Sequence, residues 1–141
     1  MDELNLERYK DENSEIEKYL SDSITSFGIE QLQGKEPRKA FCCFRDSEGK
    51  IVAAIMGSTT LNLFFISHLF VENALRNKGI GTILLSEIER IAQNFGCNIL
   101  RLNTFNKEVH AFYLNAGFTE TACITNYING FDLMYYHKKI S

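Results

Sequence analysis

Proline is almost absent from this sequence, and long apolar runs are absent altogether. Pro37 is the only proline in 141 residues, so there is no proline-rich linker, and the chain shows no repeat or low-complexity tract. A membrane-spanning helix needs about 20 consecutive apolar residues, whereas the longest run, residues 61–71, is interrupted by Asn62, Ser67 and His68. The N-terminus is acidic and polar, so we expect no signal peptide, no membrane association and a cytoplasmic location.

The cysteines lack the spacing of a metal site. Four are present, at Cys42, Cys43, Cys97 and Cys123. Adjacent cysteines do not readily serve as a ligand pair, so we expect no metal cofactor. We instead expect reduced and mostly buried thiols, as in a cytosolic protein.

The charge balance is mildly acidic, with 15 basic residues, 18 acidic residues and a net charge of −3. A general nucleic-acid-binding protein is usually basic, so we expect no nucleic-acid partner. Hydrophobic residues make up 45% of the chain and aromatic residues 12%, which indicates a packed globular protein. The length fits a single domain over residues 1–141.

Residues 71–95 are the stretch around which the rest of the chain is organised. They indicate the end of a strand, a short basic turn with two glycines, and then a long amphipathic helix. Apolar residues recur with helical spacing on one face of that helix. They are Ile80, Ile83, Leu84, Ile88, Ile91, Ala92 and Phe95.

The turn before this helix, residues 76–81, has the properties of an anion site. Gly79 and Gly81 allow the backbone to approach a ligand closely, and the first N–H groups of a helix lie unpaired at the positive end of its dipole. No acidic residue precedes Glu87 in the helix. The turn therefore predicts a site for an anion such as a phosphate, although glycines that serve packing alone are the alternative. The spacing is neither that of a P-loop nor that of a dinucleotide fingerprint.

Hydrophobic patterning predicts alternating strands and helices along the whole chain. Residues 4–9 alternate weakly and indicate either a first strand or an unstructured lead-in. A helix capped by Asn13 or Ser14 follows, Gly28 ends or kinks it, and residues 29–33 form a second short helix. The remaining elements are strands 40–45, 50–60 and 63–72, the helix after the turn, strand 99–105, a short helix 107–115, and strands 119–128 and 131–137.

Two features of this order define the expected sheet. The helix between strands 63–72 and 99–105 makes one βαβ unit, so these two strands should be parallel. The pair Asn129-Gly130 is a strong signal for a two-residue hairpin between the last two strands. We therefore expect an α/β fold with a mixed, mainly antiparallel central sheet, one parallel βαβ unit and helices on both faces.

Two motifs, taken together, resemble those of a known family. The first is a strand that ends in a valine, followed by R/Q-x-x-G-x-G/A at the start of a helix. The second is N-x-x-A-x-x-F-Y followed by a Gly-Phe pair. This chain has Val71, Arg76, Gly79 and Gly81 for the first, and Asn106, Val109, Phe112, Tyr113 and Gly117-Phe118 for the second. In these motifs the chain resembles the GCN5-related N-acetyltransferases, the GNAT superfamily.

The resemblance covers residues 51–141, whereas residues 1–39 match only in the order of elements. Asn73 lies where the family often has proline, and Val109 lies where it has alanine. Neither side chain is expected to touch a reacting atom, so the resemblance to the fold survives both departures.

The resemblance implies roles for particular residues. It implies acetyl-CoA as co-substrate, with Tyr113 giving a proton to the departing thiolate and Asn106 lying near the cofactor. The strand before the turn would pair its backbone with the pantetheine arm, through Leu69, Phe70 and Val71. The amides of the turn would hold the pyrophosphate, through Arg76, Asn77, Lys78, Gly79, Ile80, Gly81 and Thr82. Members of the family often pair, so we also expect a homodimer.

The general base is expected at His68 or Glu72. An amine with a pKa of about 10.4 is protonated at neutral pH, so a base or a water chain to one is needed. In a regular strand Ile66, His68 and Phe70 share a face, and a bulge would change that. A hydrogen-bonded core role for His68 and a solvated strand end for Glu72 are the alternatives. Tyr113 likewise has the alternative of filling the core, and His110 is expected on the surface.

We expect an N-acetyltransferase that acts on a primary amine of a small molecule or peptide by direct attack. One alternative is a non-catalytic acyl-CoA-binding sensor or interaction domain, which would need the turn but not Tyr113. Another is acetylation of a macromolecular amine. The acceptor itself is not predicted, because the first helices and the last hairpin carry no readable motif.

Overall fold

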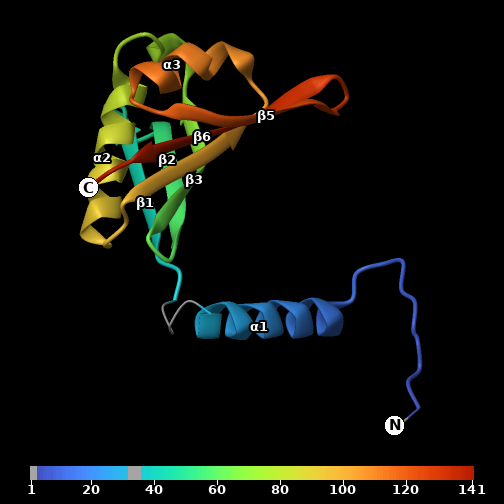
Figure 1. Cartoon of the computed structure of the whole chain (residues 1–141). Coiled ribbons are helices and arrows are strands. Elements are labelled where there is room, and N and C mark those ends of the chain that lie inside the picture. Colours follow the sequence, from blue (N-terminus) through green and yellow to red (C-terminus); the bar gives the residue numbers. More distant parts are fainter. Residues whose placement is uncertain (1–2, 32–35) are drawn as a thin grey trace. The chain divides into compact units, whose positions relative to one another are not determined.

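The computed structural model describes residues 3–31 and 36–141. The chain forms two compact units, Met1–Glu36 and Pro37–Ser141 (Figure 1).

The first unit contains one helix, α1, over Ser14–Gln31. Asn13 begins it, because its Oδ1 accepts a hydrogen bond from the amide of Ile16 at 3.0 Å, as an N-cap does. The helix continues through Gly28, so the prediction that this glycine ends the helix is wrong. Residues 29–31 of the expected second short helix belong to α1, and its last two residues lie outside the described part. Residues 4–9 form no strand, which agrees with the lead-in alternative.

The second unit is built on a six-stranded sheet with the order β1-β2-β3-β4-β6-β5. All neighbours are antiparallel except β3 and β4, which pair in parallel over Leu63–Phe65 and Ile99–Arg101. The predicted mixed, mainly antiparallel sheet with one parallel βαβ unit is thereby confirmed. The strands are β1 Lys39–Arg45, β2 Ile51–Thr60, β3 Leu63–Val71, β4 Ile99–Thr104, β5 Thr119–Ile128 and β6 Phe131–Lys139.

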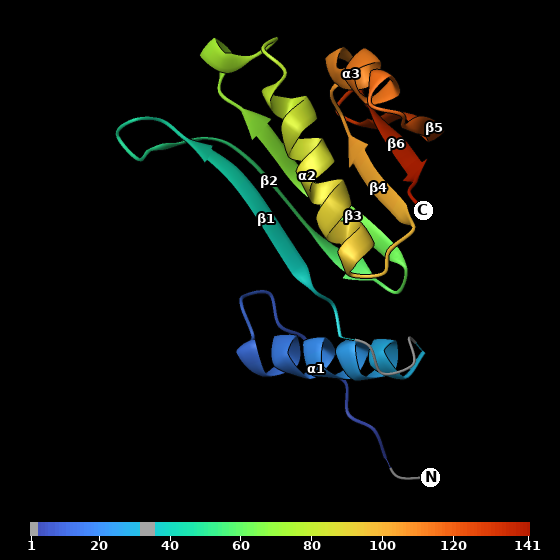
Figure 2. The same ribbon diagram turned by 90° about the vertical axis from the view of Figure 1, so that its left-hand side faces the viewer.

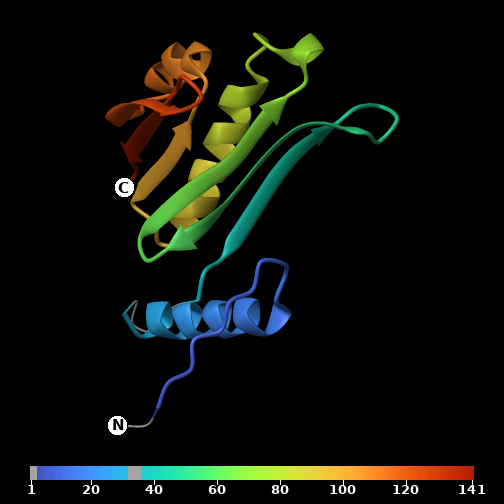
Figure 3. The ribbon, with the colours of Figure 1, turned by 90° about the vertical axis from the view of Figure 1, so that its right-hand side faces the viewer.

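Two α-helices and two 3-10 turns complete this unit. They are η1 Asn73–Leu75, α2 Ile80–Asn94, η2 Lys107–Val109 and α3 His110–Asn115. Figures 2 and 3 view the sheet from opposite sides, with α2 in front of the strands in one and behind them in the other. The buried residues of α2 and of α3 belong to the same core cluster. Both helices therefore cover one face of the sheet.

The last hairpin turns at Asn129-Gly130, as predicted. Both residues have positive φ, 48° and 80°, which is the requirement of the two-residue hairpin turn that this pair favours. The ladder between β5 and β6 is irregular between Ile124 and Ile128. The hairpin is therefore regular at its turn and interrupted a few residues before it.

A β-bulge at Ser67 changes which side chains share a face of β3. Met56 pairs with His68 and the next residue, Gly57, pairs with Ile66, so Ser67 has no partner on β2. Ile66 consequently points into the core, while His68 and Phe70 lie on the face away from α2. The bulge alternative therefore applies, and the shared face of Ile66 and His68 expected for a regular strand does not.

Gly57 makes this bulge sterically feasible. A Cβ at that position would lie 2.3 Å from the carbonyl oxygen of Phe65 and 2.4 Å from the ring of Phe64. No side chain fits at these distances, so the close approach of β2 to β3 at the bulge requires glycine.

Beyond their three paired residues, β3 and β4 separate. The ladder ends at Phe65 and Arg101, whereas β3 remains paired with β2 as far as Val71. The backbone of the second half of β3 thus has no strand partner on its β4 side within the described residues. This opening leads directly to the turn before α2.

Candidate functional site

The turn before α2 is built from two residues in the left-handed region, Asn77 with φ 61° and Gly79 with φ 80°. Gly79 is the N-cap of α2, and no side chain caps this end of the helix. The first turn of α2 contains no acidic residue. The amides of the first helical residues therefore lie at the positive end of the dipole without an intrahelical acceptor.

The two glycines of the turn have different physical roles. A Cβ at Gly79 would meet nothing within 4 Å, whereas one at Gly81 would lie 3.1 Å from Cζ of Phe112 and 3.8 Å from Cγ2 of Val71. Gly79 thus provides positive φ beside open space, where an anion can approach the backbone. Gly81 provides close packing against α3. The geometry at Gly79 is thus compatible with the predicted anion site, whereas that at Gly81 fits a packing role.

Gly81 also joins the two sequence motifs in space. Its neighbours are Val71, which ends the strand of the first motif, and Phe112, which belongs to the second. The strand end, the turn and α3 therefore meet at one point on the α2 side of the sheet.

Arg76 links the turn to the end of β3 through its side chain. Its Nε donates a hydrogen bond to the carbonyl oxygen of Val71 at 2.9 Å, and its guanidinium carbon lies 5.5 Å from the centre of the Phe70 ring. A guanidinium over an aromatic face gains cation–π attraction. Arg76 is exposed, so its remaining N–H groups can still face a ligand.

Tyr113 lies in an aromatic cluster on α3, with 7% of its surface exposed. Its ring centre is 5.1 Å from that of Phe112, 5.6 Å from that of Phe118 and 5.5 Å from that of Tyr136. Burial, and secondarily the neighbouring Tyr136, raises the pKa of Tyr113 to about 12. The hydroxyl therefore stays protonated through the neutral range and acts there as a donor.

This pKa gives a testable dependence of stability on pH. The folded-state value lies above the ordinary 10.0, so between pH 10 and 12 the unfolded chain loses this proton first. The free energy of unfolding then falls by about 3 kcal/mol as the pH rises through that window, at about 1.36 kcal/mol per unit. In Tyr113→Phe the hydroxyl is absent, so this pH-dependent part of the free energy of unfolding is absent too. In thermal melts from pH 8 to 11, we expect the wild type to lose stability relative to the variant, and a gap independent of pH would contradict the burial effect.

The structure separates the two candidate bases. His68 is exposed on the face away from α2, so it is not the hydrogen-bonded core histidine of the alternative. Glu72 follows β3 and forms an ion pair with Lys50, with 3.5 Å between Oε1 and Nζ, as a solvated strand end would. Tyr113 lies on the opposite side of the sheet from His68.

Asn106 has a structural role of its own. Its Oδ1 accepts a hydrogen bond from the amide of Glu108 at 2.9 Å, which caps η2. Its side-chain NH₂ group donates no hydrogen bond to another described residue. Asn106 is exposed at the end of β4, on the far side of the opening from Val71.

His110 and Tyr136 are residues that the sequence patterning did not single out together. Tyr136 is fully buried, with 0% of its surface exposed, and its hydroxyl lies 2.7 Å from Nδ1 of half-buried His110. The expectation that His110 lies on the surface is wrong. Alternation places Met134, Tyr136 and Lys138 on one face of β6, but Leu133 and Tyr135 make the other face equally apolar, so the pattern alone does not place Tyr136 inward.

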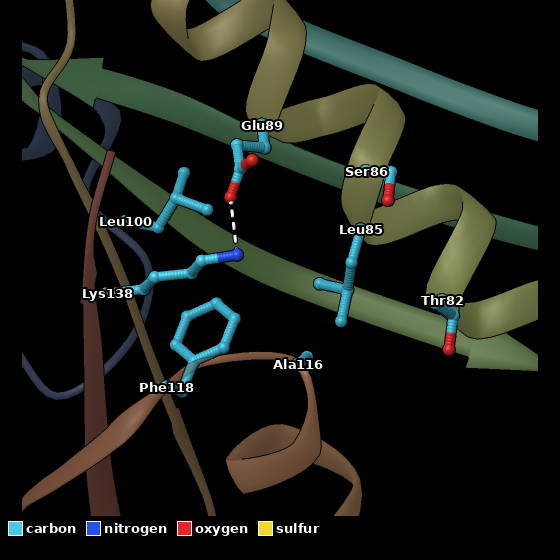
Figure 4. Close-up of a pocket in the computed structure, with 8 residues that line it drawn as sticks. All are labelled: Thr82, Leu85, Ser86, Glu89, Leu100, Ala116, Phe118 and Lys138. Atoms are coloured by element: carbon cyan, nitrogen blue, oxygen red, sulfur yellow. Dashed lines mark ion pairs between the residues drawn. The ribbon is translucent and has the colours of Figure 1, made fainter. Parts of the chain in front are cut away.

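A small cavity of about 60 Å³ lies beside α2. Figure 4 shows the ion pair at its edge, in which Nζ of Lys138 is 2.7 Å from Oε1 of Glu89. Cavities that hold cofactors are usually several hundred Å³, so this one is a packing gap that the ion pair closes. Its lining residues are Thr82, Leu85, Ser86, Glu89, Leu100, Ala116, Phe118 and Lys138.

All four cysteines are free. Cys97 is buried and Cys42 half-buried, but Cys43 and Cys123 are exposed, so the expectation of mostly buried thiols is wrong. Burial raises the pKa of the Cys97 thiol. Burial is also the main reason that the pKa of the Cys42 thiol is raised, with charged neighbours contributing less. Neither is therefore an activated nucleophile. Among the described residues, no helix is long and apolar enough to span a membrane.

Comparison with known proteins gives consistent matches. The model of the acetyltransferase (GNAT) family matches residues 2–118. A protein of Agrobacterium fabrum, Acetyltransferase Atu2258, is 23% identical over 127 residues, which cover 90% of this chain and 93% of that protein.

Solved structures show the same fold. A protein from Agrobacterium tumefaciens that is described as an acetyltransferase superposes with a TM-score of 0.87 at 22% identity, covering 97% of this chain and 100% of that one. An acetyltransferase from Bacillus cereus gives 0.83 at 22% identity, with 95% and 98% covered. A Bacillus anthracis protein described as a streptothricin acetyltransferase, solved with acetyl coenzyme A, gives 0.66 at 18% identity, with 76% and 65% covered.

Proposed function

Because the chain belongs to the acetyltransferase (GNAT) family, we propose that it transfers the acetyl group of acetyl-CoA to a primary amine of a small molecule or peptide. The amine would attack the thioester directly. The family match spans residues from both compact units, which supports one acetyltransferase domain over residues 1–141.

The observation that carries this proposal is the uncapped N-terminus of α2 beside the opening between β3 and β4. Open space at Gly79 and the unpaired amides that follow it fit a pyrophosphate. The whole turn, Arg76 to Thr82, would contribute amides and two cations. Acetyl-CoA, when bound, supplies an acyl group activated as a thioester.

The second half of β3 is suited to an extended amide-containing chain. From Ile66 to Val71 its backbone has no strand partner on the β4 side within the described residues, although the carbonyl of Val71 accepts a hydrogen bond from Nε of Arg76. The strand can therefore pair its backbone at Leu69, Phe70 and Val71 with the amides of a pantetheine arm, as strands pair with extended peptides. The NH₂ group of Asn106 lies across the opening and can donate to the same ligand.

Removing a proton from the acceptor amine is the larger demand on the site. An amine with a pKa of about 10.4 costs roughly 4 to 5 kcal/mol to deprotonate at pH 7. His68 is our first candidate for the base, because the bulge turns it toward the face away from α2, from which an amine can reach the opening. Glu72 is the second candidate, and its pairing with Lys50 must break for it to accept a proton.

Tyr113, on the α2 side of the sheet, acts as a donor to the leaving group, whereas the base accepts a proton from the amine. A thiol has a pKa of about 8.5 and Tyr113 one of about 12, so complete proton transfer from Tyr113 would be uphill by about 5 kcal/mol. A hydrogen bond donated by its hydroxyl to the developing thiolate avoids that cost. We therefore assign Tyr113 to stabilise the leaving group through that hydrogen bond.

Direct transfer needs no cysteine nucleophile. We expect Cys42→Ala, Cys43→Ala, Cys97→Ala and Cys123→Ala to retain kcat within about 3-fold, because none of these thiols is paired with a base. Steady-state thiol release and mass spectrometry of the protein after mixing with acetyl-CoA check this. A stoichiometric acetyl-cysteine species that forms and decays at the rate of turnover would contradict direct transfer.

The test of the function is calorimetric titration with acetyl-CoA, followed by thiol release over a panel of amines. Binding with release for one amine class supports the enzyme and identifies its substrates. Binding without release for any amine, including peptides and an aminoacyl-tRNA, would favour the acyl-CoA sensor. Absence of binding would contradict the assignment of the turn.

We further propose that the protein is cytoplasmic and homodimeric. The four free thiols suit a reducing compartment. Large apolar side chains, among them Phe41 and Phe70, are 63% and 59% exposed on the face of the sheet away from α2. Such surfaces often mark contacts with another chain or with a ligand.

A further inference from the structure

α3 is a helix of only six residues, His110–Asn115. A helix this short is not stable by itself, so its position depends on tertiary contacts. Tyr113 is the only residue of α3 that is buried. The contacts that hold the start of α3 therefore decide where the Tyr113 hydroxyl lies.

The first residue of α3 makes a polar contact with the sheet. Nδ1 of His110 lies 2.7 Å from the hydroxyl of Tyr136 on β6. The other partner of that hydroxyl is Sδ of Met134 at 3.8 Å, and a thioether is a weak acceptor. Without the imidazole, the hydroxyl of a fully buried tyrosine would keep only this weak partner, which is unfavourable.

The Tyr136 ring connects His110 with Tyr113. Its centre is 5.7 Å from that of His110 and 5.5 Å from that of Tyr113. His110 and Tyr113 are three residues apart on α3, so they lie on the same helical face. Tyr136 packs against both of them.

We propose that His110 is a positioning residue for acetyl transfer. Its hydrogen bond to Tyr136 fixes the start of α3 on β6 and so holds the Tyr113 hydroxyl at the leaving thiolate. This inference rests on the proposed role of Tyr113. His110 acts through Tyr113 and need not touch either substrate.

The experiment is a double-mutant cycle that measures kcat and the KM for acetyl-CoA, with the amine that releases thiol fastest. His110→Leu is expected to lower kcat about 10-fold, since small displacements of a catalytic group have effects of this order. KM should change less than about 2-fold, because the turn is untouched. His110→Asn should restore most of kcat, because Oδ1 can replace Nδ1. In a Tyr113→Phe background, His110→Leu should have no further effect.

Two further variants make the result decisive. Tyr136→Phe keeps the ring and removes the hydroxyl, so it should repeat the His110→Leu pattern even if His110→Leu does not fold. Lys107→Ala removes a different side-chain link to β6, the ion pair at 2.9 Å between Lys107 of η2 and Asp132, and should leave kcat within about 2-fold.

Each outcome has a distinct meaning. A loss of kcat in the wild-type background alone supports the inference. An equal loss in both backgrounds, or an equal loss in Lys107→Ala, means general loosening and overturns it. If Tyr113→Phe lowers kcat but His110→Leu and Tyr136→Phe do not, the positioning role fails and the role of Tyr113 remains. If Tyr113→Phe has no effect while thiol is still released, the roles of Tyr113 and His110 both fail and acetyl transfer stands. If no amine releases thiol, the proposed function fails together with both roles.

Discussion

Tyr113→Phe is expected to lower kcat by about 10- to 1000-fold and to leave the KM for acetyl-CoA close to that of the wild type. A loss of this size is typical when an enzyme loses one positioned proton donor or one hydrogen-bond donor that faces a developing negative charge. Turnover should persist, because a thiolate with a conjugate-acid pKa of about 8.5 is a fair leaving group without assistance. Steady-state kinetics at saturating acetyl-CoA measures the effect.

Tyr113→Phe removes only the hydroxyl, because phenylalanine keeps all three ring contacts of Tyr113. The protein should therefore remain folded, which near-ultraviolet circular dichroism can verify. Tyr127→Phe is a matched control, since it removes a hydroxyl from a tyrosine that is 55% exposed on β5. If both variants turn over like the wild type, Tyr113 fills the core and does no chemistry.

The second large effect is expected for Gly79→Asp, which should weaken the binding of acetyl-CoA by at least about 100-fold. The new carboxylate would lie beside the amides that we assign to the pyrophosphate, so the two anions would repel each other. The Cβ itself meets no atom within 4 Å. α2 should therefore remain formed, and calorimetry measures the change in Kd.

Gly79→Asn is the matched control for this prediction. Asparagine and aspartate have nearly the same shape, and both tolerate the positive φ of this position better than most residues. We expect the Asn variant to bind much more tightly than the Asp variant, with a difference that shrinks at high salt. Equal losses would assign the effect to backbone strain, and unchanged affinity in both would mean that phosphate does not bind at this turn.

Most of the second unit was predictable because its signals are local. The apolar period of α2, the glycines before it and the Asn129-Gly130 turn each lie within a few residues of the structure that they specify. The bulge at Ser67 was not predictable in this way. It depends on a register with Gly57 on another strand, and the pattern of β3 alone fits an unbulged strand equally well.

The site was predictable to the extent that it follows from contiguous motifs. The turn and Tyr113 came from such motifs, whereas the hydrogen bond between His110 and Tyr136 joins residues 26 positions apart. That contact exists only because α3 packs on β6. The helix α1 was misjudged for another reason: a glycine inside a helix costs only about 1 kcal/mol, so Gly28 does not stop a helix that its neighbours favour.

The bulge also bears on how such a protein diverges. Gly57 lies outside every motif of the site, yet it permits the register that turns His68 and Phe70 to the face away from α2. A lineage that keeps this glycine can vary the exposed side chain at position 70 without disturbing the core beneath β3. A lineage that replaces it must first shift β2 against β3, because a Cβ at position 57 would lie 2.3 Å from the carbonyl oxygen of Phe65.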